Sequence, residues 1–472
     1  MELTGKLQEQ YLWVDALCII QDSDEIMQQT IRDMDRIYAQ SVLTIVAATC
    51  LSANDSLPGV AGKRRWTQWY QKISPSLTLS AHFDFKDYMM CSKYNQRAWT
   101  FQEYHLATRL LIFASNGQVY FSCKEAVYSE EVTPGKHLEP DAAMLDGAQH
   151  MNLHLGQDRW STYRQVVQEY TKRILTQPRD VLDAFSGISK NICRERFIDG
   201  LPVNMFDHAL LWQPREYLQR REGFSSWSWA GWIGQVYFSD DWCLSDYREQ
   251  HDIKRERIQG QFETQTWIVW HSSRGKHAKS PSYLHDGPPQ LRDSASNAVA
   301  PGMCFPGRPQ NVSPTPSLLL DALNRADSKL QQIRYLQFWT MSAYYGIEFD
   351  QSAVVRYSSF EPENTGNGLR RFHLRDTSGK NCGWVLLDKD WVDYSTKNMA
   401  LQEFIMLSEV RFLSTGELKQ QEVDPAETTE FNAMMITWND GRAERAGLGR
   451  IKRDALACSC KRPMRWKEIL LG

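Results

Sequence analysis

The sequence predicts an α/β protein with a partial parallel sheet flanked by helices, then a helical connection, then a Trp-rich mixed or β region. Three observations predict this order. Residues 11–48 pass from short apolar runs to an apolar helical period and back to an apolar run. Residues 160–192 keep apolar side chains at helical spacing. Residues 335–438 alternate short apolar stretches with turn residues, which is typical of strands.

The first predicted strand lies at the front of the chain. Leu12–Val14 and Leu17–Ile20 are apolar, too short for a helix, and typical of a buried parallel strand. They enclose one acid, Asp15. Because open α/β sheets bind ligands at the carboxyl ends of their strands, Asp15 is a candidate ligand-binding residue.

A helix and a second strand are predicted to follow. Asp22 is expected to cap the helix, with Glu25 at the capping-box spacing. The apolar face of this helix is expected to consist of Met27, Ile31, Met34 and Tyr38. Val42–Ala48 then forms the second buried strand, so residues 11–48 are predicted to be a βαβ unit.

Extended segments and a short helix are predicted up to residue 123. Ile73–Phe85 is expected to be extended, and Trp99–Leu106 to be a helix. Leu110–Ala114 and Gln118–Cys123 are separated by Ser-Asn-Gly, a turn signal, and are predicted to pair as a hairpin.

The predicted domains are 1–130, a helical and Trp-rich connection at 131–270, a disordered Pro-rich insertion at 271–317, and a β-rich region at 318–472. Helices are expected at Trp160–Leu175 and Arg179–Ile192. The strands expected in the last region are Tyr335–Thr340, Gly368–Asp376, Gly383–Leu387, Glu403–Phe412 and Ala433–Trp438, with a terminal strand or helix from Arg465.

The tryptophans of Ser226–Trp232 allow two interpretations. A stripe of exposed tryptophans would bind sugar or stack on bases. The alternative is buried aromatic packing, which is the more common fate of such side chains.

Composition argues against several classes of partner. The formal net charge of −3 gives no electrostatic signal for nucleic acid. No apolar run approaches the roughly 20 residues of a membrane helix, and no basic and apolar leader opens the chain. Of ten cysteines, only Cys458 and Cys460 lie close together. We therefore expect a cytoplasmic protein with no nucleic-acid or membrane partner, no metal and no cofactor.

Several motifs together resemble one family. YLWVDALCIIQD followed by MDRIYAQSVLTIVAA resembles the core of the fungal heterokaryon-incompatibility (HET) domain. The further blocks in the family's order are Leu57–Val60, Gln96–Glu103, Arg109–Phe113 and Gln118–Cys123. The family usually opens with a strand that ends in a Ser-Tyr-Cys-Trp-Gly-like motif, and nothing similar precedes Tyr11. The expectation is therefore an N-terminally incomplete domain, either a truncated gene model or a surviving partial domain.

The resemblance implies a fungal protein that acts in the cytosol and triggers programmed cell death after non-self recognition. It implies self-association of the HET domain. It also implies an upstream partner, either a non-self sensor or the product of an incompatible allele.

The HET domain in turn resembles the Toll/interleukin-receptor (TIR) fold, some members of which cleave NAD. On this resemblance Glu103 matches the catalytic glutamate, a carboxylate able to stabilise the oxocarbenium-like ribose as the nicotinamide bond breaks. Trp99 would form a wall for a flat ring, and Arg97 would bind a phosphate. Asp15 and Gln21 would hydrogen bond ribose hydroxyls. NAD is thus expected as a substrate and not as a resident cofactor.

Structural roles for the same residues stay open. Glu103 can instead pair with Arg97 or Arg109 on a surface helix, Asp15 can be a buried structural acid, and Trp99 can be a core residue. The sequence therefore leaves three functions open: a TIR-like NAD nucleosidase, a non-catalytic death-signalling adaptor, and a truncated inactive relic.

Overall fold

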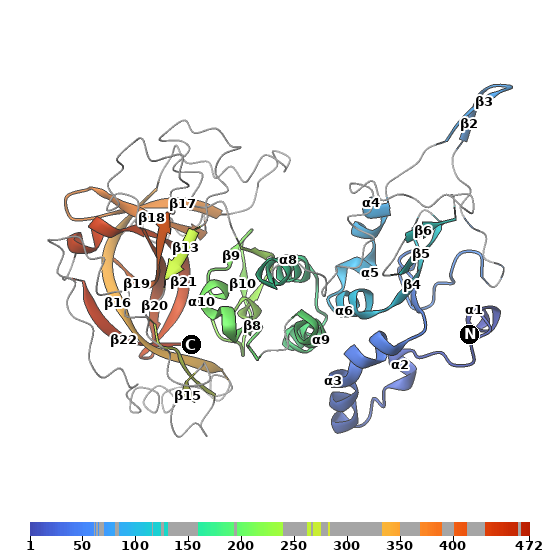
Figure 1. The fold of residues 1–472 in the computed structure, drawn as a ribbon, viewed down its shortest axis with the longest axis horizontal. Coiled ribbons are helices and arrows are strands. Elements are labelled where there is room, and N and C mark those ends of the chain that lie inside the picture. The colour runs from blue at the N-terminus through green and yellow to red at the C-terminus, as the bar shows by residue number, and fades with distance from the viewer. Residues whose placement is uncertain are drawn as a thin grey trace. The chain divides into compact units, whose positions relative to one another are not determined.

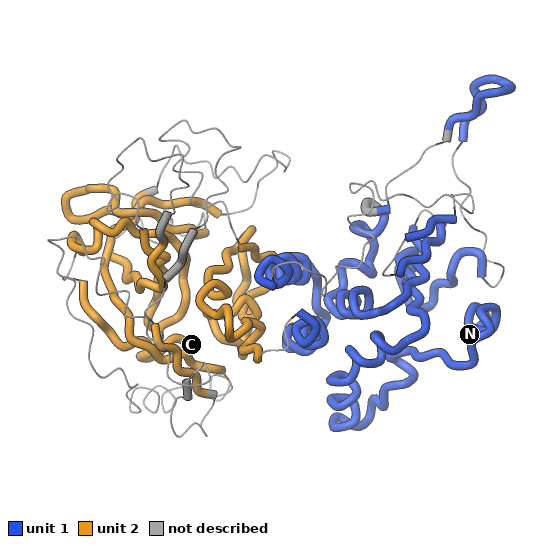
Figure 2. The backbone as a smooth tube through the Cα atoms, in the orientation of Figure 1, with its two compact units in different colours: residues 1–195 blue, residues 196–472 orange. Residues whose placement is uncertain are grey.

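The computed structural model describes residues 1–60, 62, 65, 70–80, 85–115, 117–123, 127–130, 159–192, 196–238, 262–265, 268–274, 282–283, 333–349, 369–388, 401–412, 430–460 and 464–472. The chain forms two compact units, residues 1–195 and residues 196–472 (Figure 2). The division falls inside the predicted connection at 131–270. No helix among the described residues is long and apolar enough to span a membrane.

The first unit contains a four-stranded sheet in the order β1-β4-β5-β6 (Figure 1). These strands are β1 Thr44–Val46, β4 Arg109–Phe113, β5 Val119–Cys123 and β6 Val127–Ser129. β1 and β4 are parallel, whereas β4–β5 and β5–β6 are antiparallel. The hairpin predicted at 110–123 is confirmed. Parallel pairing, which was predicted for the whole sheet, is limited to one pair of strands among the described residues.

The strand predicted at Leu12–Val14 and Leu17–Ile20 is wrong. Residues 11–14 are irregular, and α2 (Asp15–Cys18) replaces the strand. The Val14 carbonyl accepts from the amides of Leu17 and Cys18, which coils the chain into one helical turn. Leu17 and Ile20 are 75% and 48% exposed, so this apolar run is not buried in a sheet and no βαβ unit forms.

The helix predicted after it is confirmed as α3 (Asp24–Gln40), with Met34 and Tyr38 buried. Its cap is Ser23 and not the predicted Asp22. Ser23 has the extended backbone that an N-cap requires, and its hydroxyl accepts from the Ile26 amide at 3.5 Å.

Further short elements complete the first unit. They are α1 Glu2–Lys6, the β2 Tyr70–Ser74 and β3 Leu77–Ser80 hairpin, α4 Phe85–Met90, α5 Lys93–Gln96, α6 Trp99–Leu106, α8 Arg159–Thr171, η1 Pro178–Val181 and α9 Asp183–Ile192. The predicted helix at 99–106 is confirmed, and the helix predicted at 160–175 forms as α8 but ends at Thr171. The helix predicted at 179–192 is divided into η1 and α9.

Helices α3, α6 and α9 pack against one another. Gly187 of α9 lies where they meet. A Cβ atom at this position would lie 2.4 Å from Oε1 of Gln102 on α6 and 2.7 Å from Cβ of Asp35 on α3. The absence of a side chain at Gly187 therefore allows the three helices to approach closely.

The second unit is built on a sheet whose strand pairings close into a ring (Figure 1). The ring runs β16-β19-β20-β21-β18-β17 and returns to β16 through antiparallel pairs. These strands are β16 Arg334–Phe349, β17 Leu369–Arg375, β18 Asn381–Asp388, β19 Gln402–Phe412, β20 Glu430–Asn439 and β21 Arg442–Lys452. A further strand, β22 Arg465–Leu471, pairs with β16 and β21.

Alternation along the strands builds the core of this unit. Met341, Ala343 and Tyr345 of β16 lie two residues apart and join one buried cluster with Phe404 and Met406 of β19. All five strands predicted between 335 and 438 are confirmed in type, and the terminal element is a strand. The tight turn between β20 and β21 uses Asp440 and Gly441, both at positive φ (49° and 83°), which suits a two-residue hairpin.

The tryptophan segment is buried. Trp227 and Trp229 are almost fully buried, and their indole nitrogens donate to the carbonyls of Arg334 and Gly200. Ser226 donates through its hydroxyl to the Gly472 carbonyl. The interpretation as buried packing is therefore confirmed, and Trp227 and Trp229 present no stripe for sugars or bases.

Small elements surround this segment. They are β7 Phe197–Ile198, β8 Leu201–Pro202, η2 Val203–Met205, α10 Phe206–Ala209, β9 Gln213–Pro214, β10 Gln219–Arg220, η3 Trp229–Gly231, β11 Trp232–Ile233, β12 Val236–Tyr237 and η7 Arg453–Cys458. β13 Phe262–Gln265 extends the sheet beside β19.

Most of the predicted disordered insertion at 271–317 lies outside the described residues. Within it, β14 His271–Arg274 pairs with β16, and β15 Ser282–Tyr283 pairs with β14. At these two places the prediction of disorder is wrong, because the backbone is paired in the sheet.

Candidate functional site

The candidate site is centred on Glu103, a partly buried residue of α6. Tyr38, on α3, lies close enough to its carboxylate for the two side chains to shift each other's pKa. Three charged side chains act on it from other segments: Arg97 from the turn before α6, Asp15 from α2, and Arg173 from the segment after α8. The site thus combines residues from segments far apart in the sequence.

Burial sets the protonation of Glu103. The pKa of this carboxyl is raised from a usual value of 4.5 to about 7; removal from water is the main cause, and the charge of Asp15 adds to it. Arg97, Tyr38 and Arg173 favour the ionised form and lower the same pKa. The balance leaves a carboxyl that exchanges its proton near neutral pH, as catalytic acids and bases do.

Tyrosines line the buried side of this group. Burial raises the pKa of Tyr38 far above its usual value, so its hydroxyl stays protonated and remains a donor. The Trp13 ring meets the Tyr38 ring edge-on, with centroids 5.7 Å apart. Tyr94, on α5, is also close enough for Glu103 to raise its pKa, after the larger effect of burial. Its hydroxyl is buried and has no hydrogen-bond partner among the described residues.

Arg173 fixes the turn that precedes α6. Its Nη2 donates to Oδ1 of Asn95 at 2.5 Å, and its Nη1 donates to the Arg97 carbonyl at 3.2 Å and to Oγ1 of Thr100 at 3.3 Å. The guanidinium also lies 4.8 Å from the centroid of the Phe101 ring. Burial lowers the pKa of Arg173 to about 10, so the side chain stays charged at neutral pH.

Backbone hydrogen bonds also join the segment after α8 to the turn before α6. The Ile174 amide donates to the Gln96 carbonyl at 2.6 Å, and the Ala98 amide donates to the Ile174 carbonyl at 3.0 Å. The start of α6 is therefore held by a segment that follows α8.

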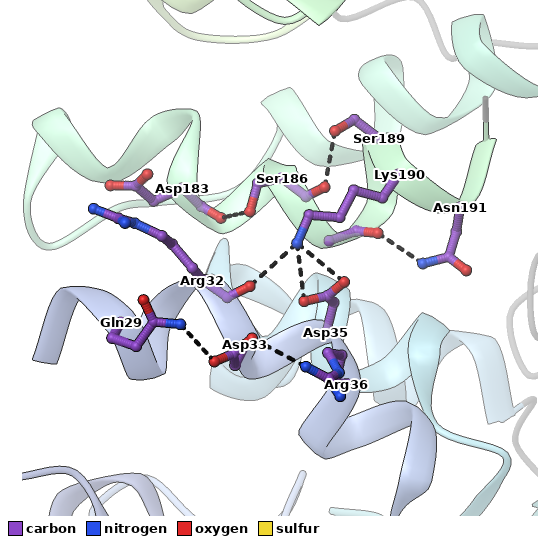
Figure 3. A network of polar contacts seen from close by, with 11 residues as sticks. Gln29, Arg32, Asp33, Asp35, Arg36, Asp183, Ser186, Ser189, Lys190 and Asn191 are labelled. Carbon is purple, nitrogen blue, oxygen red and sulfur yellow. Dashed lines mark hydrogen bonds and ion pairs between the residues drawn. The ribbon is translucent and has the colours of Figure 1, made fainter. Parts of the chain in front are cut away.

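Polar contacts between α3 and α9 fix the helix that carries Tyr38 (Figure 3). Nζ of Lys190 lies 3.1 Å from both carboxylate oxygens of Asp35 and 3.1 Å from the Arg32 carbonyl oxygen. On α3 itself, Asp33 accepts from Gln29 at 2.8 Å and pairs with Arg36 at 3.7 Å. A single exposed ion pair contributes little stability, so these contacts mainly set the orientation of α3.

The predicted site residues are only partly brought together. Asp15 and Arg97 act on Glu103, and both are exposed. Trp99 opens α6 and is partly buried. Gln21 is exposed, and its amide donates to the Ile19 carbonyl at 3.0 Å, with no recorded contact to Glu103 among the described residues. Their roles in binding stay predictions.

The structural alternatives fare differently. Asp15 is exposed and not a buried acid. Nη1 of Arg109 donates to the Val42 carbonyl at 3.4 Å. The structural alternative that remains for Glu103 is therefore an interaction with Arg97 and Tyr38.

Sequence reasoning missed three members of the site. Tyr38 ends the apolar stripe of its helix and was interpreted as a core residue. Tyr94 and Arg173 carry no local signal, because their role depends on the packing of α5, α6 and α8. Among the described residues, no group of three or more His, Cys, Asp or Glu side chains is arranged to hold a metal ion.

Residues 1–103 match the sequence model of a family described as "Heterokaryon incompatibility protein (HET)". The chain carries a HET domain. Neither a curated protein nor a solved structure matches the chain. The family match reaches Glu103 within α6, and it covers Asp15, Tyr38, Tyr94 and Arg97. Arg173 lies beyond the matched residues but in the same compact unit as the HET domain.

Proposed function

We propose that this HET-domain protein mediates non-self recognition and triggers programmed cell death by cleaving the nicotinamide–ribose bond of NAD. The observation that carries the proposal is Glu103, a carboxyl with a pKa of about 7 that lies near Tyr38 and Arg97. The resemblance to TIR proteins supports the same residue as the catalytic carboxylate.

The reaction requires little from the protein beyond charge stabilisation and orientation. As the bond breaks, its electron pair leaves with nicotinamide and positive charge develops on the ribose. Ionised Glu103 stabilises that charge, as carboxylates do in glycosidases. Water then adds to the ribose carbon and a proton is released, which gives ADP-ribose and nicotinamide.

Neighbouring residues supply binding groups. Arg97 binds the pyrophosphate through its planar guanidinium. Asp15 and Gln21 accept from or donate to the ribose hydroxyls, and Trp99 stacks on a flat ring of the substrate. Asp15 and Arg97 both act on the pKa of Glu103, which supports a shared site for them.

Activation occurs through self-association of the HET domain after a non-self sensor or an incompatible allele product is engaged. Tyr11, Leu17 and Ile20 are large apolar side chains exposed on this domain. Exposed apolar side chains contribute to interaction surfaces, which supports assembly through the domain.

A non-catalytic death-signalling adaptor is the second candidate. The observation that favours it is that Arg97 and Tyr38 already lower the pKa of Glu103, as structural partners of a carboxylate do. In this function the Glu103 group only stabilises the domain, and cell death follows from assembly alone.

Expression in fungal cells separates the two candidates. Viability and cellular NAD are measured for the wild type and for Glu103→Gln, which keeps the shape of the side chain and removes its charge. Glu2→Gln is the matched control, because Glu2 is exposed and pairs with Lys6. Loss of both killing and NAD depletion in Glu103→Gln alone supports the enzyme. Killing by Glu103→Gln without NAD depletion supports the adaptor, and a well-folded wild type that does neither contradicts both.

A further inference from the structure

The β2–β3 hairpin of the first unit exposes both of its faces to solvent (Figure 1). Its two strands pair with each other and with no other strand among the described residues. Every residue from 70 to 79 is exposed except Ser74, which is partly buried. Because a two-stranded hairpin is only marginally stable by itself in water, this one lacks the cover that a hairpin usually has within a fold.

The large aliphatic side chains of the hairpin lie on one face. The register of β2 and β3 places Leu77 and Leu79, two positions apart on one strand, on the same side. Ile73 lies at the bulge that follows Lys72 and opposes the same part of β3. The exposed fractions are 56% for Ile73, 48% for Leu77 and 55% for Leu79. Three exposed aliphatic side chains on one small element make this face a candidate docking surface.

The opposite face of the hairpin is polar at its centre and carries a positive charge. Lys72 pairs with Thr78, so these two side chains share this face, and Tyr70 pairs with Ser80 at its end. Tyr70 is 72% exposed. The hairpin is therefore amphipathic although neither face is covered.

The sequence around the hairpin is basic. Between Asp55 and Asp84 there are four Lys or Arg residues and no Asp or Glu, in a chain whose formal net charge is −3. The ion pair of Arg65 with Glu130 offsets one of these charges. Lys63 and Arg64 lie outside the described residues, and Lys72 belongs to the hairpin itself. The positive charge is thus concentrated in the stretch of chain that also exposes the aliphatic face.

We propose that the β2–β3 hairpin docks the protein on an anionic lipid bilayer: Ile73, Leu77 and Leu79 enter the interface, and the neighbouring basic side chains bind the headgroups. Peripheral membrane elements combine these two features, an exposed apolar face and nearby Lys or Arg. Aromatic side chains concentrate at the same depth, and Tyr70 supplies one. Because the headgroup layer contains water, the open edges of the two strands keep their hydrogen bonds there.

This inference goes beyond the proposed cleavage of NAD and does not depend on it. It differs from the expectation of no membrane partner, which was based on the lack of an apolar run long enough to span a bilayer. An element that lies on the membrane surface needs no such run, since only its apolar face enters the interface.

A second copy of the chain is the competing occupant of this face. Three aliphatic side chains supply much less than the roughly 800 Å² that each partner buries in a stable protein interface. Two hairpins with the same positive charge also repel each other, whereas anionic headgroups attract both. Charge and size therefore favour lipid over a second hairpin.

The test measures co-sedimentation of the full chain with phosphatidylcholine vesicles that contain or lack phosphatidylserine. The hairpin variant combines Leu77→Ser with Leu79→Ser. The matched control combines Val42→Ser with Leu51→Ser, because these side chains are 61% and 68% exposed in the same unit. The wild type should bind the phosphatidylserine vesicles at least about ten-fold more tightly than the others, and less tightly at high salt. The hairpin variant should lose about ten-fold in this binding, and the control should lose none.

Three results overturn the proposal. The first is a wild type that does not bind phosphatidylserine vesicles or that binds both kinds equally. The second is a hairpin variant that binds as tightly as the control. The third is a hairpin variant that loses self-association in sedimentation velocity while the wild type binds no vesicles, which assigns the face to a second copy of the chain.

Amide hydrogen exchange of the wild type locates the contact without any substitution. Exchange in residues 70–80 should slow when phosphatidylserine vesicles are added, because a hairpin that opens readily in water is held closed on the membrane. Exchange in β4, at Arg109–Phe113, should stay the same. Vesicle binding with unchanged exchange in residues 70–80 overturns the proposal.

Discussion

Nη2 of Arg173 donates a 2.5 Å hydrogen bond to Oδ1 of Asn95, although the two residues are 78 positions apart in the sequence. Through this contact and two others, the segment after α8 holds the turn that leads into α6 and Glu103. The family match ends at residue 103, so a residue outside the matched region stabilises the candidate site inside it.

Replacement of Arg173 tests this contact. Arg173→Met removes the donor to Oδ1 of Asn95 and to Oγ1 of Thr100 and one of two donors to the Arg97 carbonyl, and hydrogen bonds lost at partly buried groups are costly. We expect the free energy of unfolding of the first unit to fall by about 2–4 kcal/mol, as measured by denaturant titration.

Arg179→Met is the control, since the Arg179 side chain is 82% exposed. It should change the free energy of unfolding by less than about 0.5 kcal/mol. Equal stability of the two variants would show that Arg173 does not hold the turn.

Gly187→Ala tests the packing of α3, α6 and α9. The added Cβ would lie 2.4 Å from Oε1 of Gln102 and 2.7 Å from Cβ of Asp35, so the helices must move apart. We expect destabilisation by about 1–3 kcal/mol in thermal or denaturant unfolding. Gly5→Ala in α1 is the matched helical control, because nothing lies within 4 Å of its Cβ position. A neutral or stabilising Gly187→Ala would contradict the close approach of the helices.

The stability of the first unit should depend on pH through Glu103. The folded chain keeps the Glu103 proton up to about pH 7, whereas the unfolded chain releases it near 4.5. The folded state therefore binds more protons between these values, and its free energy of unfolding falls as pH rises through this window. The loss amounts to at most about 3 kcal/mol.

Glu103→Gln removes this titration. The difference in free energy of unfolding between the variant and the wild type should grow in favour of the variant from pH 5 to pH 8. A difference that stays constant over this range would mean that the pKa of Glu103 is not raised.

Arg445 should be essential to the packing of the second unit. It is buried, donates to the carbonyls of Leu210 and Trp212, and lies 3.7 Å from the centroid of the Trp212 ring. Arg445→Met leaves both carbonyls unsatisfied, and we expect a loss of about 2–4 kcal/mol in unfolding monitored by tryptophan fluorescence. Arg465→Met, on an exposed position of β22, is the control. Similar losses in both variants would contradict a specific role for Arg445.

The local sequence pattern was sufficient to predict most of the longer helices and strands. The helical period of α3 and the alternation in β16–β20 reflect burial on one face, which a sequence displays directly. β21 was missed because its charges and its glycines at 447 and 449 interrupt the apolar pattern. The prediction of a front strand was wrong for the opposite reason. Leu17 and Ile20 are apolar but exposed, so their apolar character predicted a burial that the fold does not provide.

The candidate site was predictable in part. Glu103, Arg97 and Asp15 were identified through family resemblance, and the fold brings Arg97 and Asp15 within electrostatic reach of Glu103. Tyr38 has the sequence signature of a core residue, and its hydroxyl gains a role only when α3 packs on α6. Arg173 could not be predicted, because its contacts depend on how a distant segment returns to the turn before α6.

Nicotinamide release from NAD by the purified chain, across a range of protein concentrations, tests the central claim most directly. The account predicts turnover that rises more than in proportion to protein concentration, since activity depends on assembly, and that disappears in Glu103→Gln but persists in Glu2→Gln. Folded wild-type protein that releases no nicotinamide at any concentration, or a Glu103→Gln variant that retains full turnover, would contradict it.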